Sequence, residues 1–339
     1  MPAKPPTTDV HAHALVPGVE SLVAGRAGLK REQRETARRL GAESLAVTER
    51  VLAATKERLT DLGTRLAAMD AASVDVQLVS PSPTQYYYWA APGLAREIWT
   101  ATHEGIAALC QAAPRRLAGL GTVPLQHPQL AAAALEHAVL ECGLQGIEIS
   151  SWAPAPDGRI VDLSDPGLDG LWARAEELDA VVFLHPMGCT VDGRLDRWYL
   201  ENVVGQPLEH TIALSHLIFS GVLDRHPRLR LLASHGGGYL PTYLGRSDHA
   251  WHERPEARGC LLPPSAYMRR IAVDALVYSP DALRGLVDVF GAERVLIGSD
   301  YPFDMGVTDP VSRLDAAGLA DRDRELIAGG NAARWGLLP

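Results

Sequence analysis

The sequence predicts an α/β fold, specifically a (β/α)8 TIM barrel with a helical insertion after strand 1. Short apolar runs alternate with longer amphipathic stretches along most of the 339 residues, and there are eight such runs, the number of strands that closes a barrel. No G-x-G-x-x-G motif follows the first run, which disfavours the competing fold, an open doubly wound sheet. We therefore expect a single domain over residues 1–339.

The expected strands are short runs rich in valine, leucine and isoleucine. They cover residues 9–15, 75–80, 117–125, 146–150, 181–186, 229–235, 270–276 and 294–300. Helical patterns separate most of them, such as PQLAAAALEHAVLECG at 128–143 and LDGLWARAEELDA at 168–180. This order is typical of parallel βα units. Two segments with proline or glycine, 154–159 and 261–267, are expected to be loops.

Residues 15–60 interrupt this regular alternation. They are charged and helix-prone, and they lie between the first strand and the first regular helix. Because the loops that follow barrel strands lie on the catalytic face, we expect this insertion to cover the mouth of the barrel. The alternative is a solvated helical excursion without a role.

The overall composition limits the partners and the compartment. A formal net charge of −9 argues against nucleic acid or an anionic membrane surface as the main partner. The chain has no apolar run long enough to span a bilayer, and its first ten residues lack a secretory apolar region. The four cysteines are scattered without a C-x-x-C pair, which favours a reducing compartment. We expect a cytoplasmic protein.

The first strand, DVHAHAL, carries two histidines one residue apart. Side chains two apart in a strand point the same way, so His11 and His13 are expected on one face, together with Asp9. Large polar rings on the inner face of a strand each require a buried partner. A metal ion would satisfy both imidazoles.

Further polar side chains occur at the carboxyl ends of later strands, where barrel enzymes build their sites. His185 ends the fifth strand, His235 the sixth and Asp300 the eighth. Together with the first-strand pair they form a nitrogen and oxygen ligand set suited to zinc. Any one of these residues alone would be a weak signal. Most other histidines, His210 among them, fit helices or their edges without a catalytic role, whereas His216 and His249 are less certain.

Two further acidic residues are less certain in their direction. Asp274, in the seventh strand, either faces the mouth or holds neighbouring backbone. Glu148, on the fourth strand, would be the bridging ligand of a second metal if it pointed inward, but that strand offers no lysine or cysteine. The sequence therefore favours one metal ion.

These residues and their order resemble the amidohydrolase superfamily, in particular its branch of metal-dependent, non-oxidative decarboxylases named for 2-amino-3-carboxymuconate-6-semialdehyde decarboxylase. The resemblance covers the first strand and the chain from about residue 62 onward, and it rests on DVHAHAL, FLHP, SHGGGYLPTYLGR and GSDYPF. It implies four metal ligands, namely His11, His13, His185 and Asp300. It also implies that His235 is catalytic beside Asp300, and that Arg246 reaches the substrate from the neighbouring subunit of a homodimer.

The substrate contacts are less well defined. Trp89, in YYYWA, and Phe303, in GSDYPF, either wall a planar substrate or pack internally. The chain departs from the branch at Met187, where the decarboxylase that names it has tryptophan. A second substrate arginine of the branch falls in residues 15–60, where Arg50 and Arg58 are candidates and surface charge is the alternative.

The resulting hypothesis is a metal-dependent non-oxidative decarboxylase, a carbon–carbon lyase, acting on a conjugated or aromatic carboxylic acid. One divalent ion, with zinc favoured over manganese, would hold a water molecule, and His235 would move a proton. The same residues would also serve a hydrolase of an amide, lactone or C–C bond, or a hydratase. A barrel that binds metal without turnover is a third reading.

Overall fold

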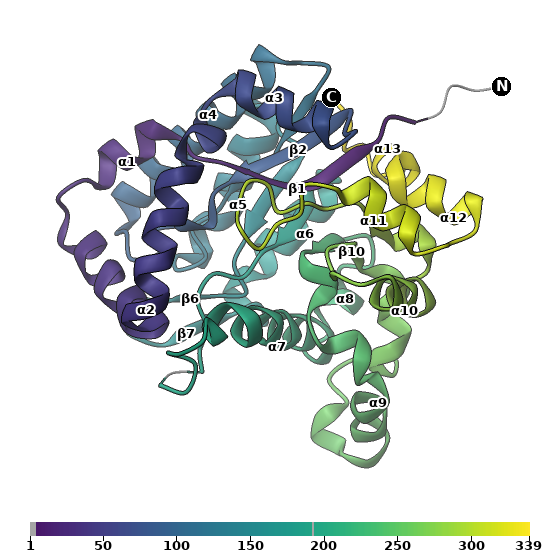
Figure 1. Ribbon diagram of the computed structural model, residues 1–339. Helices are drawn as coiled ribbons and strands as arrows, with labels where there is room; N and C mark the ends of the chain where they lie inside the picture. The colour runs from purple at the N-terminus through teal and green to yellow at the C-terminus, as the bar shows by residue number, and fades with distance from the viewer. Residues whose placement is uncertain (1–4, 192) are drawn as a thin grey trace.

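The computed structural model describes residues 5–191 and 193–339, and its parallel strands form the wall of a barrel (Figure 1). One sheet has the order β1–β2–β3 and another the order β11–β10–β9–β8–β5–β4. Bridges from Asp9 to Ile297 and from Ala12 to Tyr301 join β1 to the chain around and after β11. The TIM barrel predicted from the sequence is therefore confirmed. The predicted domain also includes residues 1–4 and 192, which lie outside the described residues.

The barrel strands are short and agree with the eight predicted runs. They are β1(Thr8–Ala14), β2(Val76–Pro81), β3(Leu117–Gly119), β4(Gly121–Thr122), β5(Gly146–Ile149), β8(Val181–Leu184), β9(Arg230–Ala233), β10(Ala272–Asp274) and β11(Val295–Leu296). The third run, predicted as one strand over 117–125, is divided at Leu120, because β3 pairs with β2 whereas β4 pairs with β5. Most strands end before the predicted boundary, so His185, His235 and Asp300 lie just beyond the strand ends.

Helices surround the barrel, as expected for βα units (Figure 1). They are α1(Pro17–Val23), α2(Ala27–Thr60), α3(Leu62–Ala71), α4(Pro92–Ala112), α5(Pro128–Glu136), α6(Asp169–Glu177), α7(Gln206–Phe219), α8(Val222–Arg225), α9(Leu244–Glu253), α10(Pro280–Phe290), α11(Pro310–Ala316), α12(Asp321–Glu325) and α13(Asn331–Arg334). Among residues 5–191 and 193–339, no helix is both long enough and apolar enough to cross a membrane.

Two segments predicted as loops contain some regular structure. An antiparallel hairpin, β6(Trp152–Pro154) with β7(Ile160–Asp162), encloses most of the first segment. Gly158 provides the left-handed residue of its turn, with a φ of 85°. In the second segment, 3-10 turns begin at Pro264.

The core has an inner part, enclosed by the strands, and an outer part between strands and helices. The inner part takes side chains from successive strands, including Val10, Leu78, Leu120, Phe183, Leu232, Ala272 and Leu296. Trp335 and Leu337 pack against this inner cluster from the end of the barrel where the strands begin. The end where the strands finish is left for polar residues.

The insertion consists mainly of α2, which is bent at Gly41. This residue has a φ of 73° and a ψ of 162°, a conformation reserved for glycine, and a Cβ there would collide with the carbonyl oxygen of Asp196. Leu40, Thr48 and Leu52 of α2 line the same cavity as His185 and Asp300. The insertion thus contributes side chains to the cavity beside His185 and Asp300. That it covers the mouth of the barrel stays a prediction.

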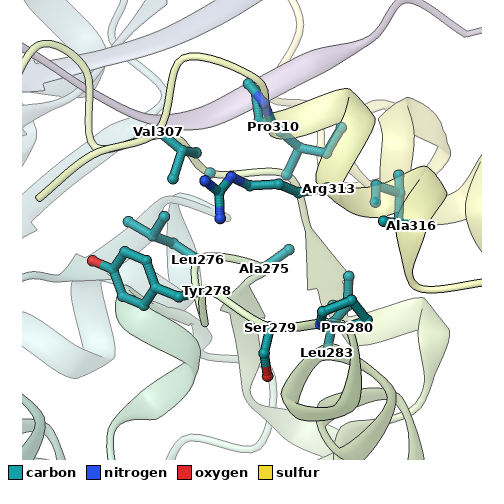
Figure 2. A pocket seen from close by; sticks show the side chains of 13 residues that line it. Ala275, Leu276, Tyr278, Ser279, Pro280, Leu283, Val307, Pro310, Arg313 and Ala316 are labelled. Carbon is teal, nitrogen blue, oxygen red and sulfur yellow. The ribbon is translucent and has the colours of Figure 1, made fainter.

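A small separate pocket lies between the segment that follows β10 and helix α11 (Figure 2). Its volume of about 80 Å³ has room for water but not for an aromatic acid. In Figure 2 the guanidinium of Arg313 reaches from α11 toward Val307 and the segment that carries Leu276. We regard this pocket as a packing gap and look for the functional site elsewhere.

Candidate metal centre

The four predicted ligand residues meet at the carboxyl ends of the strands. His11, His13, His185 and Asp300 are all buried, and each offers one ligand atom such that these atoms lie within 4.8 Å of one another. The two ends of the chain thus supply one group: β1 brings two imidazoles, and the segment after β11 brings the carboxylate. The geometry is that of a group able to hold one metal ion.

The individual contacts fit a divalent cation. Asp300 Oδ1 lies 3.3 Å from His11 Nε2 and 3.2 Å from His13 Nε2. His185 Nε2 and Asp300 Oδ1 are buried without a hydrogen-bond partner in the described structure. Buried polar atoms without partners are costly, and three imidazole nitrogens with one carboxylate oxygen are a donor set suited to zinc and similar ions. The residues present therefore fit the metal.

A bulge in β1 turns Asp9 away from this group. The register with β2 shifts between Asp9 and Ala12. Asp9 Oδ2 instead accepts hydrogen bonds from Gln77 Nε2 at 3.1 Å and Ser299 Oγ at 2.6 Å, on the helix side of the wall. The prediction that Asp9 shares a face with the two histidines is wrong, because the bulge changes the alternation of side chains after Val10.

Asp274 performs both functions that the sequence left open. Its Oδ2 lies 2.6 Å from His11 Nδ1, and its Oδ1 accepts hydrogen bonds from the backbone N–H groups of Gly236 and Leu276. Burial lowers the pKa of His11, but the carboxylates of Asp300 and Asp274 outweigh it and raise that pKa to about 10. The two carboxylates thus favour positive charge at this position, which a bound cation would also supply.

Glu148 points inward, which settles its direction. Its carboxylate accepts hydrogen bonds from Ser80 Oγ at 2.6 Å and Tyr86 Oη at 2.7 Å. Its Oε2 also lies 3.5 Å from His13 Nδ1. Burial raises the pKa of this carboxyl group. Glu148 therefore orients His13 from behind, and it is not a member of the four-residue group.

His235 lies beside the group, immediately after β9. Its Nε2 is 3.6 Å from Asp300 Oδ2, and its Nδ1 is 3.2 Å from His210 Nε2. Its φ of 51° is unusual for a side chain of this size, and the three glycines that follow it also have positive φ. The HGGG motif therefore supplies backbone freedom that turns the His235 imidazole toward Asp300.

His210 was not among the site residues predicted from the sequence. This residue of α7 is fully buried, and its Nε2 also lies 3.0 Å from Ser234 Oγ. Nothing in its helical context distinguished it from the other helix histidines, because the contact depends on how α7 crosses behind β9.

A cavity of about 470 Å³ opens onto the centre. Its lining includes His185, His235, Asp300 and Phe303, whose ring centroid lies 5.3 Å from that of His13. Cavities of this size accept small aromatic molecules. Phe303 thus lies at the site, which is one of the two alternatives expected for this residue.

The other residues predicted to contact the substrate do not line this cavity. Trp89 is not in the lining of this cavity but in that of an adjoining groove beneath α2, which shares Arg39 and Met187 with it. There the Trp89 indole N–H donates to Glu32 Oε2 at 3.0 Å. Arg246 is exposed on α9, outside the lining of the cavity. Arg50 and Arg58 are also absent from that lining, whereas Arg39 of the same insertion is present. Their roles as substrate contacts stay predictions.

Comparison with known proteins identifies relatives along the whole barrel. The amidohydrolase family model matches residues 8–335. The 2-amino-3-carboxymuconate-6-semialdehyde decarboxylase of Dictyostelium discoideum is 33% identical over 283 residues, which is 82% of this chain and 77% of that protein. The family predicted from the sequence is confirmed.

Two solved structures of 5-carboxyvanillate decarboxylases have the same fold. The 5-carboxyvanillate decarboxylase of Sphingomonas paucimobilis superposes with a TM-score of 0.82 at 26% identity, covering 99% of this chain and 100% of that one. The enzyme of that name from Novosphingobium aromaticivorans, complexed with manganese and 4-hydroxy-3-methoxy-5-nitrobenzoic acid, gives a TM-score of 0.84 at 24% identity, with 98% and 96% covered. This second likeness concerns the fold alone.

Removing a ligand should remove the metal. We expect His11→Ala and Asp300→Ala to lose bound metal, because each deletes one of four donor atoms. Asp274→Asn should retain the fold and weaken metal affinity by about 10- to 100-fold, because it disturbs the orientation of His11. Elemental analysis after dialysis measures the metal content. His216→Ala, which removes an imidazole outside the group, is the matched control, and one metal per chain in His11→Ala would refute the ligand set.

Proposed function

The chain belongs to the amidohydrolase family, and on that premise we propose that it is a metal-dependent, non-oxidative decarboxylase of an aromatic or conjugated carboxylic acid. The observation that carries the proposal is the meeting of three imidazoles and one carboxylate beside a cavity of about 470 Å³, which His185, Asp300 and His235 line. The decarboxylase relatives support the reaction type.

We further propose that His11, His13, His185 and Asp300 hold one divalent ion. The three imidazoles favour zinc, and manganese is the alternative, as in the Novosphingobium enzyme. When bound, the ion supplies Lewis-acid polarisation of substrate oxygen atoms. Asp274 and Glu148 keep His11 and His13 in the required orientation from behind.

His235 would transfer the proton. Its Nδ1 faces His210 and Ser234, which leaves Nε2 directed toward Asp300 and the cavity. In the proposed step a C–H bond forms when His235 delivers its proton to the carbon that bears the carboxylate. The C–C bond to the carboxylate then breaks, and carbon dioxide leaves while the bonding electrons return to the conjugated system. Phe303 would pack against the ring of the substrate.

Arg39 is the one arginine or lysine among the described residues that line this cavity. Its Nε is buried without a hydrogen-bond partner, and it lies 3.6 Å from Glu201 Oε1. A guanidinium with free donor capacity pairs well with a carboxylate. We therefore propose Arg39 as a carboxylate contact within the chain, and Arg246 as one supplied across a homodimer. The four free cysteines support a reducing, cytoplasmic location.

The reaction is tested by carbon dioxide release. We expect the metal-loaded protein to decarboxylate at least one acid from a panel of hydroxybenzoates and carboxymuconate semialdehydes. His235→Asn should lower the rate by about 10²- to 10⁴-fold, because it removes the proton donor. The imidazole of His216 contacts Ser164 outside the cavity, so His216→Asn should retain the rate. Turnover of an amide or lactone without carbon dioxide would instead favour a hydrolase.

The role of Arg39 is tested by substrate saturation. We expect Arg39→Gln to raise KM by about tenfold, because a charge-assisted contact to the substrate carboxylate is lost. Arg39→Lys should recover part of that loss. The neighbouring residue, Arg38, has a side chain that is 51% exposed. Arg38→Gln should therefore leave KM unchanged. Equal KM values in all three variants would contradict the assignment.

The shared site is tested by mixing inactive subunits. Neither Arg246→Ala nor His235→Ala should be active alone. In an equimolar mixture, half of the dimers combine the two variants, and each such dimer contains one intact site if Arg246 acts across the interface. Recovery of about a quarter of the wild-type activity is then expected. A mixture that stays inactive although mixed dimers form would show that the sites are not shared.

A further inference from the structure

A second cavity lies at the end of the barrel opposite the metal centre, and its lining is strongly basic. It measures about 500 Å³, within the range of small-ligand sites. Five of its residues are arginines, and we call it the arginine cavity: Arg228, Arg230, Arg270, Arg294 and Arg334. Arg230 is the first residue of β9, Arg294 precedes β11 and Arg270 precedes β10 by two residues, so all three lie where strands begin.

The charges in this cavity are not balanced by its own residues. Asp179 is the one carboxylate in the described lining, and its Oδ2 lies 2.9 Å from Arg230 Nη1. Arg228 reaches Glu176 at 3.9 Å, a weak contact at an exposed side chain. Neither Arg294 nor Arg334 makes an ion pair or side-chain hydrogen bond with any described residue. A chain of net charge −9 thus concentrates positive charge at one place.

The three half-buried guanidiniums are held in position before any ligand arrives. Arg230 and Arg294 lie against the ring of Trp335, with their Cζ atoms 5.3 and 5.7 Å from its centroid. Arg230 donates to the carbonyl oxygens of Asp179 and Trp335, and Arg270 donates to that of Leu223. Cation–π contacts and backbone hydrogen bonds reduce the mobility of these long side chains. Ordered cations lose less entropy when they bind an anion.

Close packing of like charges has an energetic cost here. Burial lowers the pKa of Arg294, the carboxylate of Glu293 raises it, and the nearby charge of Arg270 lowers it. Burial lowers the pKa of Arg230 as well. The positive charges of Arg294 and Arg270 thus lie close enough to repel each other. A bound anion would relieve this repulsion.

We propose that the arginine cavity binds a small multivalent oxyanion of the phosphate class, either the free ion or the phosphoryl group of a small metabolite. Guanidinium groups pair with tetrahedral oxyanions through two parallel N–H···O bonds, and five arginines line this one cavity. A monovalent ion would leave most of the charge unbalanced. This site is independent of the decarboxylase proposal, because it lies at the other end of the barrel.

Binding there should stabilise the strands that carry the metal centre. The strands that begin near Arg230, Arg270 and Arg294 lead to His235, Asp274 and Asp300 respectively. A ligand that joins their first residues binds only the folded barrel, so it raises the free energy of unfolding by mass action. The expected consequence is an increased melting temperature in phosphate compared with chloride at equal ionic strength.

The test is calorimetric titration of the metal-loaded protein with inorganic phosphate and, separately, with a ribonucleoside 5′-monophosphate. We expect saturable binding of one anion per chain. Arg294→Gln and Arg270→Gln should each weaken binding by about tenfold, because each removes a charge-assisted contact. Tighter binding of the nucleotide would indicate a phosphorylated metabolite, and tighter binding of phosphate would indicate the free ion.

The matched control is Arg115→Gln. Arg115 is an exposed arginine just before β3, at the same end of the barrel but outside the cavity lining. This variant should bind phosphate as the wild type does. Three results would overturn the proposal: no saturable binding at low ionic strength, equal weakening by Arg115→Gln, or binding that is unaffected by Arg294→Gln and lost in His11→Ala, which would place the anion at the metal centre.

Discussion

The candidate metal centre depends on the backbone seam that joins the first strand to the last. Val10 N–H donates to Ile297 O, Asp300 N–H to His11 O and His13 N–H to Tyr301 O, at 2.7 to 2.8 Å. These bonds connect residues almost 290 positions apart and bring two imidazoles next to a carboxylate. No single element could do this, because His11 and His13 belong to β1, His185 follows β8 and Asp300 follows β11. Closure of the barrel and assembly of the centre are therefore one event.

The centre is held together at some conformational cost, which its surroundings offset. His235 and Asp300 both have positive φ, at 51° and 58°, and such backbone costs of order 1 kcal/mol or more per residue. Asp274 connects the two regions, since it contacts His11 on one side and the backbone of Gly236 on the other. The hydrogen bonds that fix the glycine motif are thus the ones that orient a metal ligand. The carboxylate of Asp274, which orients His11, therefore also stabilises the strained backbone next to His235.

The sequence predicts most of this arrangement because its signals are local. An apolar run shows where a strand is, and a histidine or aspartate at its end shows what faces the mouth. The sequence pattern does not predict the direction of a side chain where that direction depends on contacts with residues distant in the sequence. The bulge that rotates Asp9 outward is a property of pairing with β2, and no residue in DVHAHAL encodes it. His210 and Arg39 were missed for the same reason, since both meet the site through the docking of helices.

Different parts of the barrel determine the chemistry of the site and the shape of its cavity. The strand ends fix the chemistry, since the ligand set and His235 come from the barrel strands and the segments that directly follow them. The shape of the cavity comes instead from α2, whose bend at Gly41 brings Leu40 and Thr48 over His185. An acid enters a space bounded by a rigid floor and an inserted helical wall. We therefore expect the choice of substrate to depend on the residues of α2 and on Met187, which also lines the cavity, more than on the centre beneath them.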